Sequence, residues 1–224
     1  DADCPIGQHT QARMRFWLGT DNRLMFGCYR ECPKLEILRA VGASWRGCFP
    51  DGKMPDRPKQ EIAAKYPYCD AGGRVRYQTI RLEPGCYGRD KDFKQRRPHP
   101  SGEGWVNNLD GVERVLYRLP ELMAADPELP VCVLSGEKDV ETMRAIGFVA
   151  TTNVCGEKAE WLDSYSEALK GRHVVVIPDG DTTGKRHANE VLGSLLGTAR
   201  SVRRVVLPDP LKDPTALVTH LRFN

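Results

Sequence analysis

Beyond residue 130, short apolar runs alternate with longer amphipathic segments. The runs at residues 131–134 and 173–177 are apolar at almost every position, which is typical of parallel strands buried on both faces. Further strands are predicted at 148–152 and 201–207, and helices at 137–146, 161–169 and 183–196. Because strands and helices alternate in this way, we expect an α/β domain with a parallel sheet covered on both faces.

The pattern before residue 130 is different. Residues 61–68 and 75–82 are strand-like and flank a glycine-containing turn at 70–73, which predicts a β-hairpin. Residues 83–104 are polar and are expected to form a loop. Residues 111–125 have a helical pattern that Pro120 interrupts. This part of the chain is therefore expected to be a separate α+β region.

These patterns predict four regions. Residues 1–47 are dense in Cys, aromatic residues and Arg, and end in a helical stretch at 33–41. Residues 48–60 contain three prolines and are expected to be a linker. Residues 61–127 would form a basic α+β subdomain, and residues 128–224 the parallel-sheet domain.

Composition and charge narrow the class of protein. Charged residues make up 28% of the chain and the mean hydropathy is −0.48, as in soluble globular proteins. The sequence has neither a membrane-spanning apolar run nor a signal-peptide pattern, so a cytoplasmic location and no membrane partner are expected. Residues 1–120 hold 21 Lys and Arg against 15 Asp and Glu, whereas residues 121–224 hold 12 against 15. This charge distribution is typical of a protein that binds phosphates with its basic N-terminal part and cations with its acidic C-terminal part.

Four residues near the N-terminus have the spacing of metal ligands. Cys4, His9, Cys28 and Cys32 form the pattern C-x4-H…C-x3-C. Zinc favours four tetrahedral Cys and His ligands, and a module of about 40 residues cannot stabilise itself by burial alone. The stretches that begin at residues 13 and 23 are predicted as strands of this module. The alternative is a cluster of free thiols beside a surface histidine.

Acidic residues follow two of the apolar strands. Asp179 and Asp181, with Gly180 between them, come directly after the strand at 173–177, and Ser135 and Glu137 follow the strand at 131–134. In open parallel sheets, ligands bind beyond the carboxyl ends of the strands. Magnesium prefers oxygen ligands and shares them with water and substrate phosphates. The alternative is that the aspartates only shape a turn and cap the next helix.

These segments resemble a known family. The stretches VCVLSGEKDVETMRAIGFVATTN and GRHVVVIPDGDTTGKRHANEV are similar to the TOPRIM domain of phage- and plasmid-type DNA primases, and KDFKQRRP and YRLPEL resemble the segment that precedes it. The N-terminal set resembles the Cys-His-Cys-Cys zinc ribbon of the same primases, in which the first pair is spaced more closely. The family has a general-base Glu where this chain has Ser135. Glu137 stands where a second Glu is common in phage relatives.

The resemblance implies a nucleotidyltransferase of the primase type, which makes RNA primers on a single-stranded DNA template from ribonucleoside triphosphates. It implies Mg²⁺ or Mn²⁺ on Asp179 and Asp181, Zn²⁺ on the ribbon, catalytic roles at Glu137 or Ser135, and a replicative helicase as a further partner. Ser135 leaves three explanations open: an inactivating substitution, a relocated base, or binding without catalysis. The alternative functions are a catalytically weakened DNA-binding replication accessory and a TOPRIM nuclease.

Basic residues are the candidates for nucleic-acid contact. Arg supplies charge for phosphates, and aromatic rings beside it can stack on bases. For each of these residues, an ordinary solvated surface position is the alternative. The candidates are Lys94, Arg96, Arg97, Lys138, Arg13 and Arg15.

Overall fold

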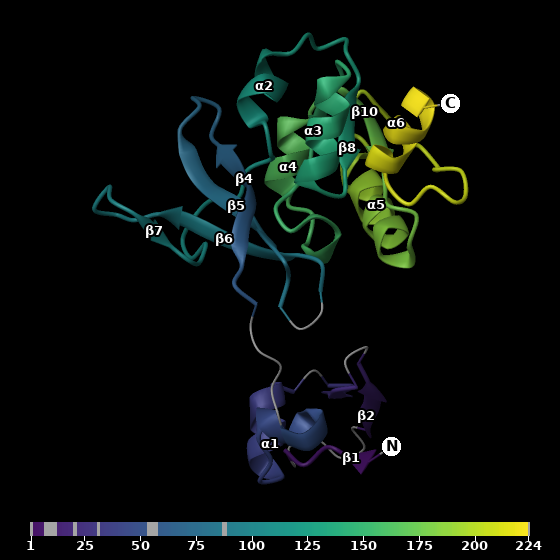
Figure 1. Cartoon of the computed structure of the whole chain (residues 1–224). Helices are drawn as coiled ribbons and strands as arrows, with labels where there is room; N and C mark the ends of the chain where they lie inside the picture. The colour runs from purple at the N-terminus through teal and green to yellow at the C-terminus, as the bar shows by residue number, and fades with distance from the viewer. Residues whose placement is uncertain are drawn as a thin grey trace. The chain divides into compact units, whose positions relative to one another are not determined.

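The computed structural model describes residues 2–6, 13–19, 22–30, 32–52, 58–86 and 89–223 (Figure 1). Contacts divide the chain into two compact units. One comprises residues 1–62 and 82–92, and the other residues 63–81 and 93–224. The boundaries predicted at residues 47, 60 and 127 stay predictions. Among the described residues, no helix is both long and apolar enough to cross a membrane.

The first unit contains a small antiparallel sheet in the order β1-β2-β3. The predicted strands and helix are present, as β2, β3 and α1, whereas β1 was not predicted. A core of Cys, Met, Phe, Ile and Leu side chains lies among these elements, including Met14, Phe26 and Ile37. The elements are β1 (Ala2–Asp3), β2 (Arg13–Leu18), β3 (Leu24–Cys28), α1 (Lys34–Ala40) and two 3-10 turns, η1 (Trp45–Cys48) and η2 (Pro50–Gly52).

A four-stranded antiparallel sheet has the order β4-β5-β6-β7. The predicted hairpin is its first pair, β4 (Glu61–Cys69) and β5 (Val75–Glu83). The Asp70 carboxylate accepts hydrogen bonds from the backbone N–H groups of Gly72 and Arg74, which closes the turn. Gly73 has a φ of 82°, a conformation that glycine adopts without a steric penalty.

Two predictions in the following segment were wrong. Residues 83–104 are not all loop, because β6 (Asp92–Pro98) lies within them and pairs with β7 (Trp105–Val106). The strand was missed because its side chains are mostly polar, and backbone pairing holds it in the sheet. Residues 111–118 are not helical; only α2 (Leu119–Ala124) forms, and its proline stands in the first turn, where no amide donor is needed.

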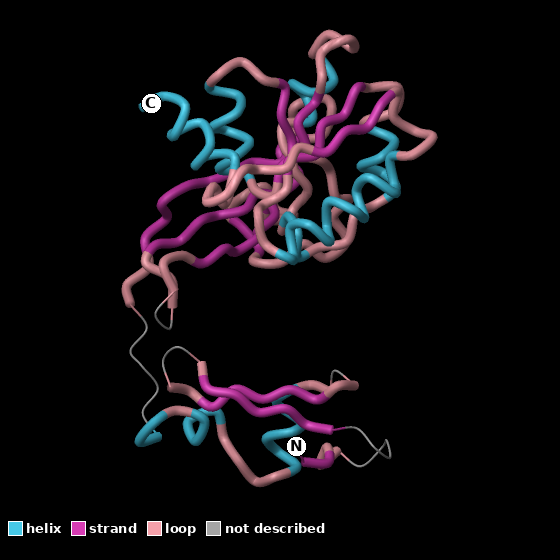
Figure 2. Tube along the Cα trace, turned by 90° about the vertical axis from the view of Figure 1, so that its right-hand side faces the viewer, coloured by secondary structure: helices cyan, strands magenta, loops and turns pink. Residues whose placement is uncertain are grey.

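The parallel sheet that the alternating pattern predicted is confirmed, and its strands have the order β11-β10-β8-β9. Its strands are connected by helices that lie on both faces (Figure 2). A C-terminal helix, α6, was not predicted. The elements are β8 (Val131–Leu134), α3 (Glu137–Ala145), β9 (Val149–Thr151), η3 (Gly156–Lys158), α4 (Asp163–Ala168), β10 (His173–Ile177), α5 (Thr182–Leu195), β11 (Ser201–Arg204) and α6 (Pro214–Phe223).

Alternation along the central strand β8 sends its side chains into two different cores. Val131 and Val133 lie in a core with residues of α4 and α5, whereas Cys132 and Leu134 lie in a core with residues of α3 and α6. The second core also contains a group of tyrosines from β4, β5 and the segment before α2. Both faces of the sheet are therefore covered, which explains why its central strands are apolar throughout.

Candidate functional site

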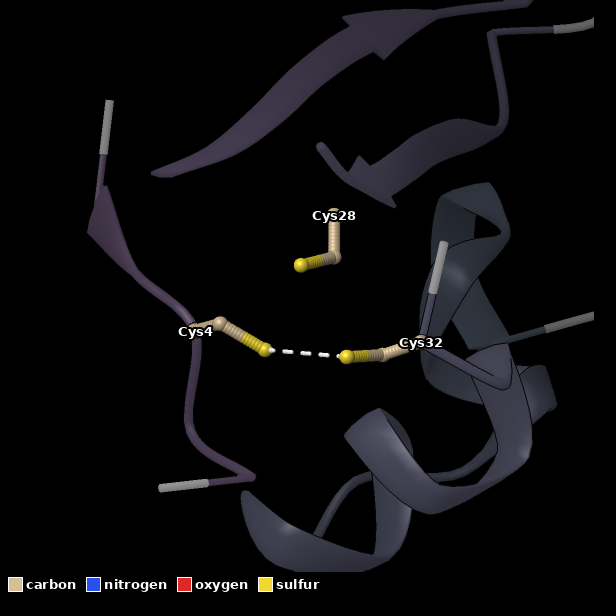
Figure 3. Close-up of side chains that lie close together, drawn as sticks. All are labelled: Cys4, Cys28 and Cys32. Carbon is tan, nitrogen blue, oxygen red and sulfur yellow. Dashed lines mark hydrogen bonds between the residues drawn. The ribbon is translucent and has the colours of Figure 1, made fainter. Parts of the chain in front are cut away.

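Three cysteines of the first unit gather around one point (Figure 3). Cys4 follows β1, Cys28 ends β3 and Cys32 precedes α1, and their sulfur atoms all lie within 4.8 Å of one another. The Sγ atoms of Cys4 and Cys32 are 3.9 Å apart, and the cysteines are free thiols. His9 lies outside the described residues. In the part of the chain that the structure describes, this is the one group of three or more Cys, His, Asp or Glu ligand atoms so close together.

The thiols of this cluster influence one another. Burial and the neighbouring Cys28 and Cys4 raise the pKa of Cys32 to about 11. Burial also acts to raise the pKa of Cys28, but hydrogen bonds from the Arg30 backbone N–H and from the other thiols outweigh it, so that this pKa is lowered. The thiolate form is thus favoured at Cys28 and disfavoured at Cys32. Such a set suits a thiophilic metal such as zinc, which binds thiolates and displaces the remaining protons.

The second group lies at the carboxyl edge of the parallel sheet. Strands β8 and β10 are neighbours, with Ile177 opposite Leu134, so the residues that follow them meet. The backbone N–H of Asp179 donates to Ser135 Oγ at 3.1 Å. Asp179 has a buried carboxylate oxygen, Oδ1, without a hydrogen-bond partner among the described residues. An orphaned buried oxygen of this kind is suited to a cation.

Several carboxylates surround Asp179. Burial raises its pKa to about 7, and repulsion from Asp139, Glu157 and Asp213 adds to the effect, whereas a hydrogen bond with Ser135 opposes it. Asp213 and Glu157 come from loops far from Asp179 in the sequence and were not predicted as site residues. The available signal for Asp213 is its place in the loop that follows a strand of the same sheet. Glu157 has the same signal, because it lies in the segment that follows β9 of this sheet.

Asp181 has the role of a helix cap. Its Oδ1 accepts a hydrogen bond from the Gly184 backbone N–H at 2.8 Å at the start of α5. A Cβ atom at Gly184 would lie 2.7 Å from the Asp179 carbonyl oxygen, so only glycine allows the helix to approach the strand end this closely. The capping alternative therefore describes Asp181 but not Asp179. An exposed capping carboxylate retains an oxygen for a further ligand.

Glu137 and Lys138 begin the helix that follows Ser135. Glu137 is 8% exposed, and its Oε1 accepts a hydrogen bond of 2.8 Å from the Tyr68 hydroxyl. Burial raises the pKa of Tyr68 well above its usual value, and repulsion from Glu137 adds to this, so the tyrosine stays a donor. Lys138 is exposed. The catalytic roles of Glu137 and Ser135 stay predictions.

The basic residues of β6 lie on two faces of its sheet. Arg96 lies over the ring of Trp105, 4.6 Å from its centroid, and donates to Gln78. Alternation places Lys94 on the same face as Arg96 and places Arg97 on the other, where it donates to Asn108. Trp105 is 40% exposed, so this face combines positive charge with an open aromatic ring.

The ribbon-like sheet carries a similar combination. Arg15 lies 5.1 Å from the ring centroid of Trp17 and 5.9 Å from that of Tyr29, and these side chains are exposed. Phe26, in contrast, is buried in the core around the cysteines. The side chain of Arg13 lies outside the described part of the chain. An Arg between two exposed rings can contact both phosphates and bases.

No protein-family model matches the chain, and no curated protein sequence matches it either. Solved structures do. A primase fragment of the bacteriophage T7 primase-helicase protein is 21% identical, with a TM-score of 0.45, over 73% of this chain and 58% of that one. The DnaG catalytic core is 23% identical, with a TM-score of 0.48, over 70% of this chain and 48% of that one.

A DNA primase domain from Pseudomonas aeruginosa is 23% identical over 70% of this chain and 46% of that one, with a TM-score of 0.51. The chain thus spans about half the length of the structures it matches. The expected α/β architecture is confirmed by the parallel sheet itself. The similarity extends this conclusion: the chain has the fold of a DNA primase domain.

Proposed function

We propose that the protein is a primase-type nucleotidyltransferase that makes short RNA primers on single-stranded DNA in a Mg²⁺-dependent reaction. The carboxylate cluster around Asp179 carries the proposal, because it places an orphaned buried oxygen at the edge of the sheet where ligands bind. The cysteine cluster and the basic, aromatic sheet face support it as parts that contact the template. Ribonucleoside triphosphates would be the substrates, and a replicative helicase and a cytoplasmic location belong to the same proposal.

In this proposal, Asp179 and Asp181 would hold a divalent cation, Mg²⁺ or Mn²⁺. When bound, the cation neutralises the charge that develops on the transferred phosphoryl group. Asp181 remains fixed by its cap on α5, and Asp179 by the bond between its backbone N–H and Ser135. Lys138, exposed in the first turn of α3, would bind a substrate phosphate. The buried Tyr68 hydroxyl would hold Glu137 in one orientation.

Primer synthesis tests the proposal directly. Zinc-loaded protein is incubated with single-stranded DNA, ribonucleotides and Mg²⁺, and Mg²⁺-dependent RNA products are expected. Asp179→Asn is expected to lower synthesis by at least about 100-fold, the scale at which loss of one electrostatic group affects such reactions. Wild-type protein with bound zinc that makes no primers would contradict the proposal. Cleavage of a 5′-labelled strand in the same reaction would identify a nuclease instead.

A second candidate is a replication accessory that binds DNA without catalysis. Ser135 favours it, because a hydroxyl at the end of β8 cannot act as a carboxylate base near neutral pH. This candidate predicts binding that weakens steeply with salt and no synthesis. Ser135→Glu should then create or increase primer synthesis. If Ser135→Glu has no effect on synthesis, position 135 does not explain the lack of activity.

The sheet face with Arg96 and Trp105 gives a separate test of template binding. Trp105→Ala should weaken binding of single-stranded DNA by about 5-fold to 100-fold, because one stacked base contributes about 1–3 kcal/mol. Arg96→Ala should weaken binding and also reduce its salt dependence. Lys170→Ala is the matched control, since it removes one positive charge that pairs only with the exposed Glu167 among the described residues. Equal losses in Arg96→Ala and Lys170→Ala, with no loss in Trp105→Ala, would indicate general charge attraction instead of a binding face.

A further inference from the structure

A group of buried tyrosines packs the antiparallel sheet against the parallel sheet. Tyr66 and Tyr68 are two residues apart on β4, so they lie on the same face, and both are buried. The ring of Tyr68 stacks on that of Tyr77 of β5, with centroids 4.6 Å apart, and the Tyr117 ring lies 5.1 Å from it. These four side chains share one core with residues of β8, α3 and β10. The two sheets are therefore joined through this group.

One hydroxyl of this group binds a charged residue of the parallel-sheet domain. The Tyr68 hydroxyl donates to Glu137 Oε1 at 2.8 Å, and Tyr68 is 0% and Glu137 8% exposed. The Tyr77 hydroxyl instead binds backbone, because it donates to the Val115 carbonyl and accepts from the Val115 N–H. A carboxylate is buried at low cost only when a donor binds it. A hydrogen bond to a charged group is also strong and directional, so it fixes relative positions more sharply than apolar packing does.

The residue that Tyr68 binds is the first residue of α3. The N-cap of this helix is Gly136, which has no side chain to accept from the first-turn N–H groups, and the Val140 N–H donates to the Gly136 carbonyl at 3.2 Å. Ser135 comes directly before Gly136, and its Oγ accepts from the Asp179 backbone N–H. An anchor at Glu137 therefore also fixes the turn from which Ser135 reaches the end of β10.

We infer that Tyr68 is a positioning residue, which acts through its hydrogen bond to Glu137. The bond fixes the beginning of α3, with Ser135 before it, relative to the antiparallel sheet. That sheet carries the proposed template-binding face, whereas the strand ends beside Ser135 carry the carboxylate cluster. The bond thus keeps the two parts of the proposed site aligned. This inference rests on the proposed function for its effect on the reaction, whereas the anchoring of α3 is independent of that function.

Hydrogen exchange tests the anchoring on the full chain, without DNA or nucleotides. Tyr68→Phe removes only the hydroxyl, and it should speed exchange of the Val140 and Asp179 amides, relative to the β8 amides, by about 10-fold or more, because a hydrogen bond to a charged group is lost. Tyr77→Phe is the matched control, since it removes a hydroxyl from the same stacked pair but leaves Glu137 bound. The control should leave the relative exchange of these two amides unchanged. Equal effects of the two variants would overturn the inference.

Primer synthesis tests the effect on the reaction, below the unfolding temperature of each variant. Tyr68→Phe should lower kcat by about 10-fold or more and leave the Kd for single-stranded DNA unchanged, whereas Tyr77→Phe should keep the kcat of the wild type. In a chain that already carries Glu137→Ala, Tyr68→Phe should lower kcat by less than about 2-fold further, because its partner is absent. Losses that multiply in full would show that Tyr68 does not act through Glu137. If the wild type makes no primers but Tyr68→Phe loosens α3, the proposed function is rejected and the anchor is retained.

Discussion

The cysteine cluster and the carboxylate cluster are both groups of potential metal ligands, but the chain builds them in opposite ways. Three thiols come within 4.8 Å of one another inside a core of few apolar residues. The carboxylates lie at the rim of a large core, and most are bound by backbone or hydroxyl donors. A metal bound by the cysteine cluster would stabilise a small fold. A metal bound by the carboxylate cluster would bind to a fold that is already formed.

The largest difference should appear when one ligand is removed from the cysteine cluster. Cys28→Ser is expected to abolish zinc binding and unfold the first unit, because structural zinc contributes on the order of 10 kcal/mol to a small module. Hydrogen exchange should show lost protection in β2 and β3, while β8 and β10 keep theirs. Cys155→Ser, at an exposed thiol outside the cluster, is the control. Protected β2 and β3 amides in Cys28→Ser would show that the cluster is not a structural site.

The carboxylate cluster should depend more on backbone packing than on its ligands. Gly184→Ala is expected to destabilise the protein by about 1–3 kcal/mol, because the new methyl group would lie against the Asp179 backbone and overpack the strand end. Gly193→Ala, in the same helix with open space around it, should stabilise by about 0.5–1 kcal/mol. Denaturant unfolding compares the two. Equal effects would mean that α5 can move away from the strand.

Removing a carboxylate from the carboxylate cluster should stabilise the metal-free protein, whereas removing a thiol from the cysteine cluster should destabilise it. Without divalent metal, Asp179→Asn is expected to be more stable than wild type by about 1–2 kcal/mol above pH 7, after allowance for solvent screening. Asp179 has a raised pKa, about 7 instead of 3.8, so the folded wild type loses stability as the pH rises between these values. The advantage of Asp179→Asn should grow over this window. Urea unfolding at several pH values measures it, and a destabilised variant at pH 8 would contradict it.

Glu141 is a carboxylate with an ion-pair partner. Its replacement should change the free energy of unfolding least, and in the direction opposite to Asp179→Asn. Arg118 donates to both oxygens of Glu141, at 2.8 and 2.9 Å. Burial acts to raise the pKa of Glu141, but Arg118 outweighs it and the pKa is lowered. Glu141→Gln should cost about 0.5–1 kcal/mol, since the pair is partly exposed. The stability from this pair is present above pH 4.5 and is lost as the pH falls through the lowered pKa.

The control for this pair is Glu128→Gln, which breaks the more exposed contact with Arg200. That variant should change the free energy of unfolding by less than Glu141→Gln at neutral pH. The two variants should become alike in strongly acidic solution. A difference between wild type and Glu141→Gln that persists there would show that packing, and not charge, makes the Glu141 contribution.

The sequence was sufficient to predict a strand where the burial of a segment and its hydrophobic pattern agree. The apolar runs at 131–134 and 173–177 predicted β8 and β10, because a strand covered on both faces is apolar at almost every position. It was insufficient for β6, whose polar residues contribute to the sheet through the backbone. It also overestimated the helix before α2, where Arg118 has a φ of 60° that no local pattern indicated.

The sequence by itself determined the alternation of strands and helices from β8 to β11, the cysteine spacing and the position of Asp179 at a strand end. These are local properties, because burial period, turn residues and ligand spacing can be recognised along the chain. Only the tertiary structure decided which carboxylates meet. Glu157 comes near Asp179 because Gly156 packs on the Ser135 backbone and Gly184 lets α5 approach the end of β10 closely. The contact between Gly156 and Ser135 joins segments that the sequence pattern does not connect. Such contacts depend on how the elements are packed together, which no periodicity along the chain records.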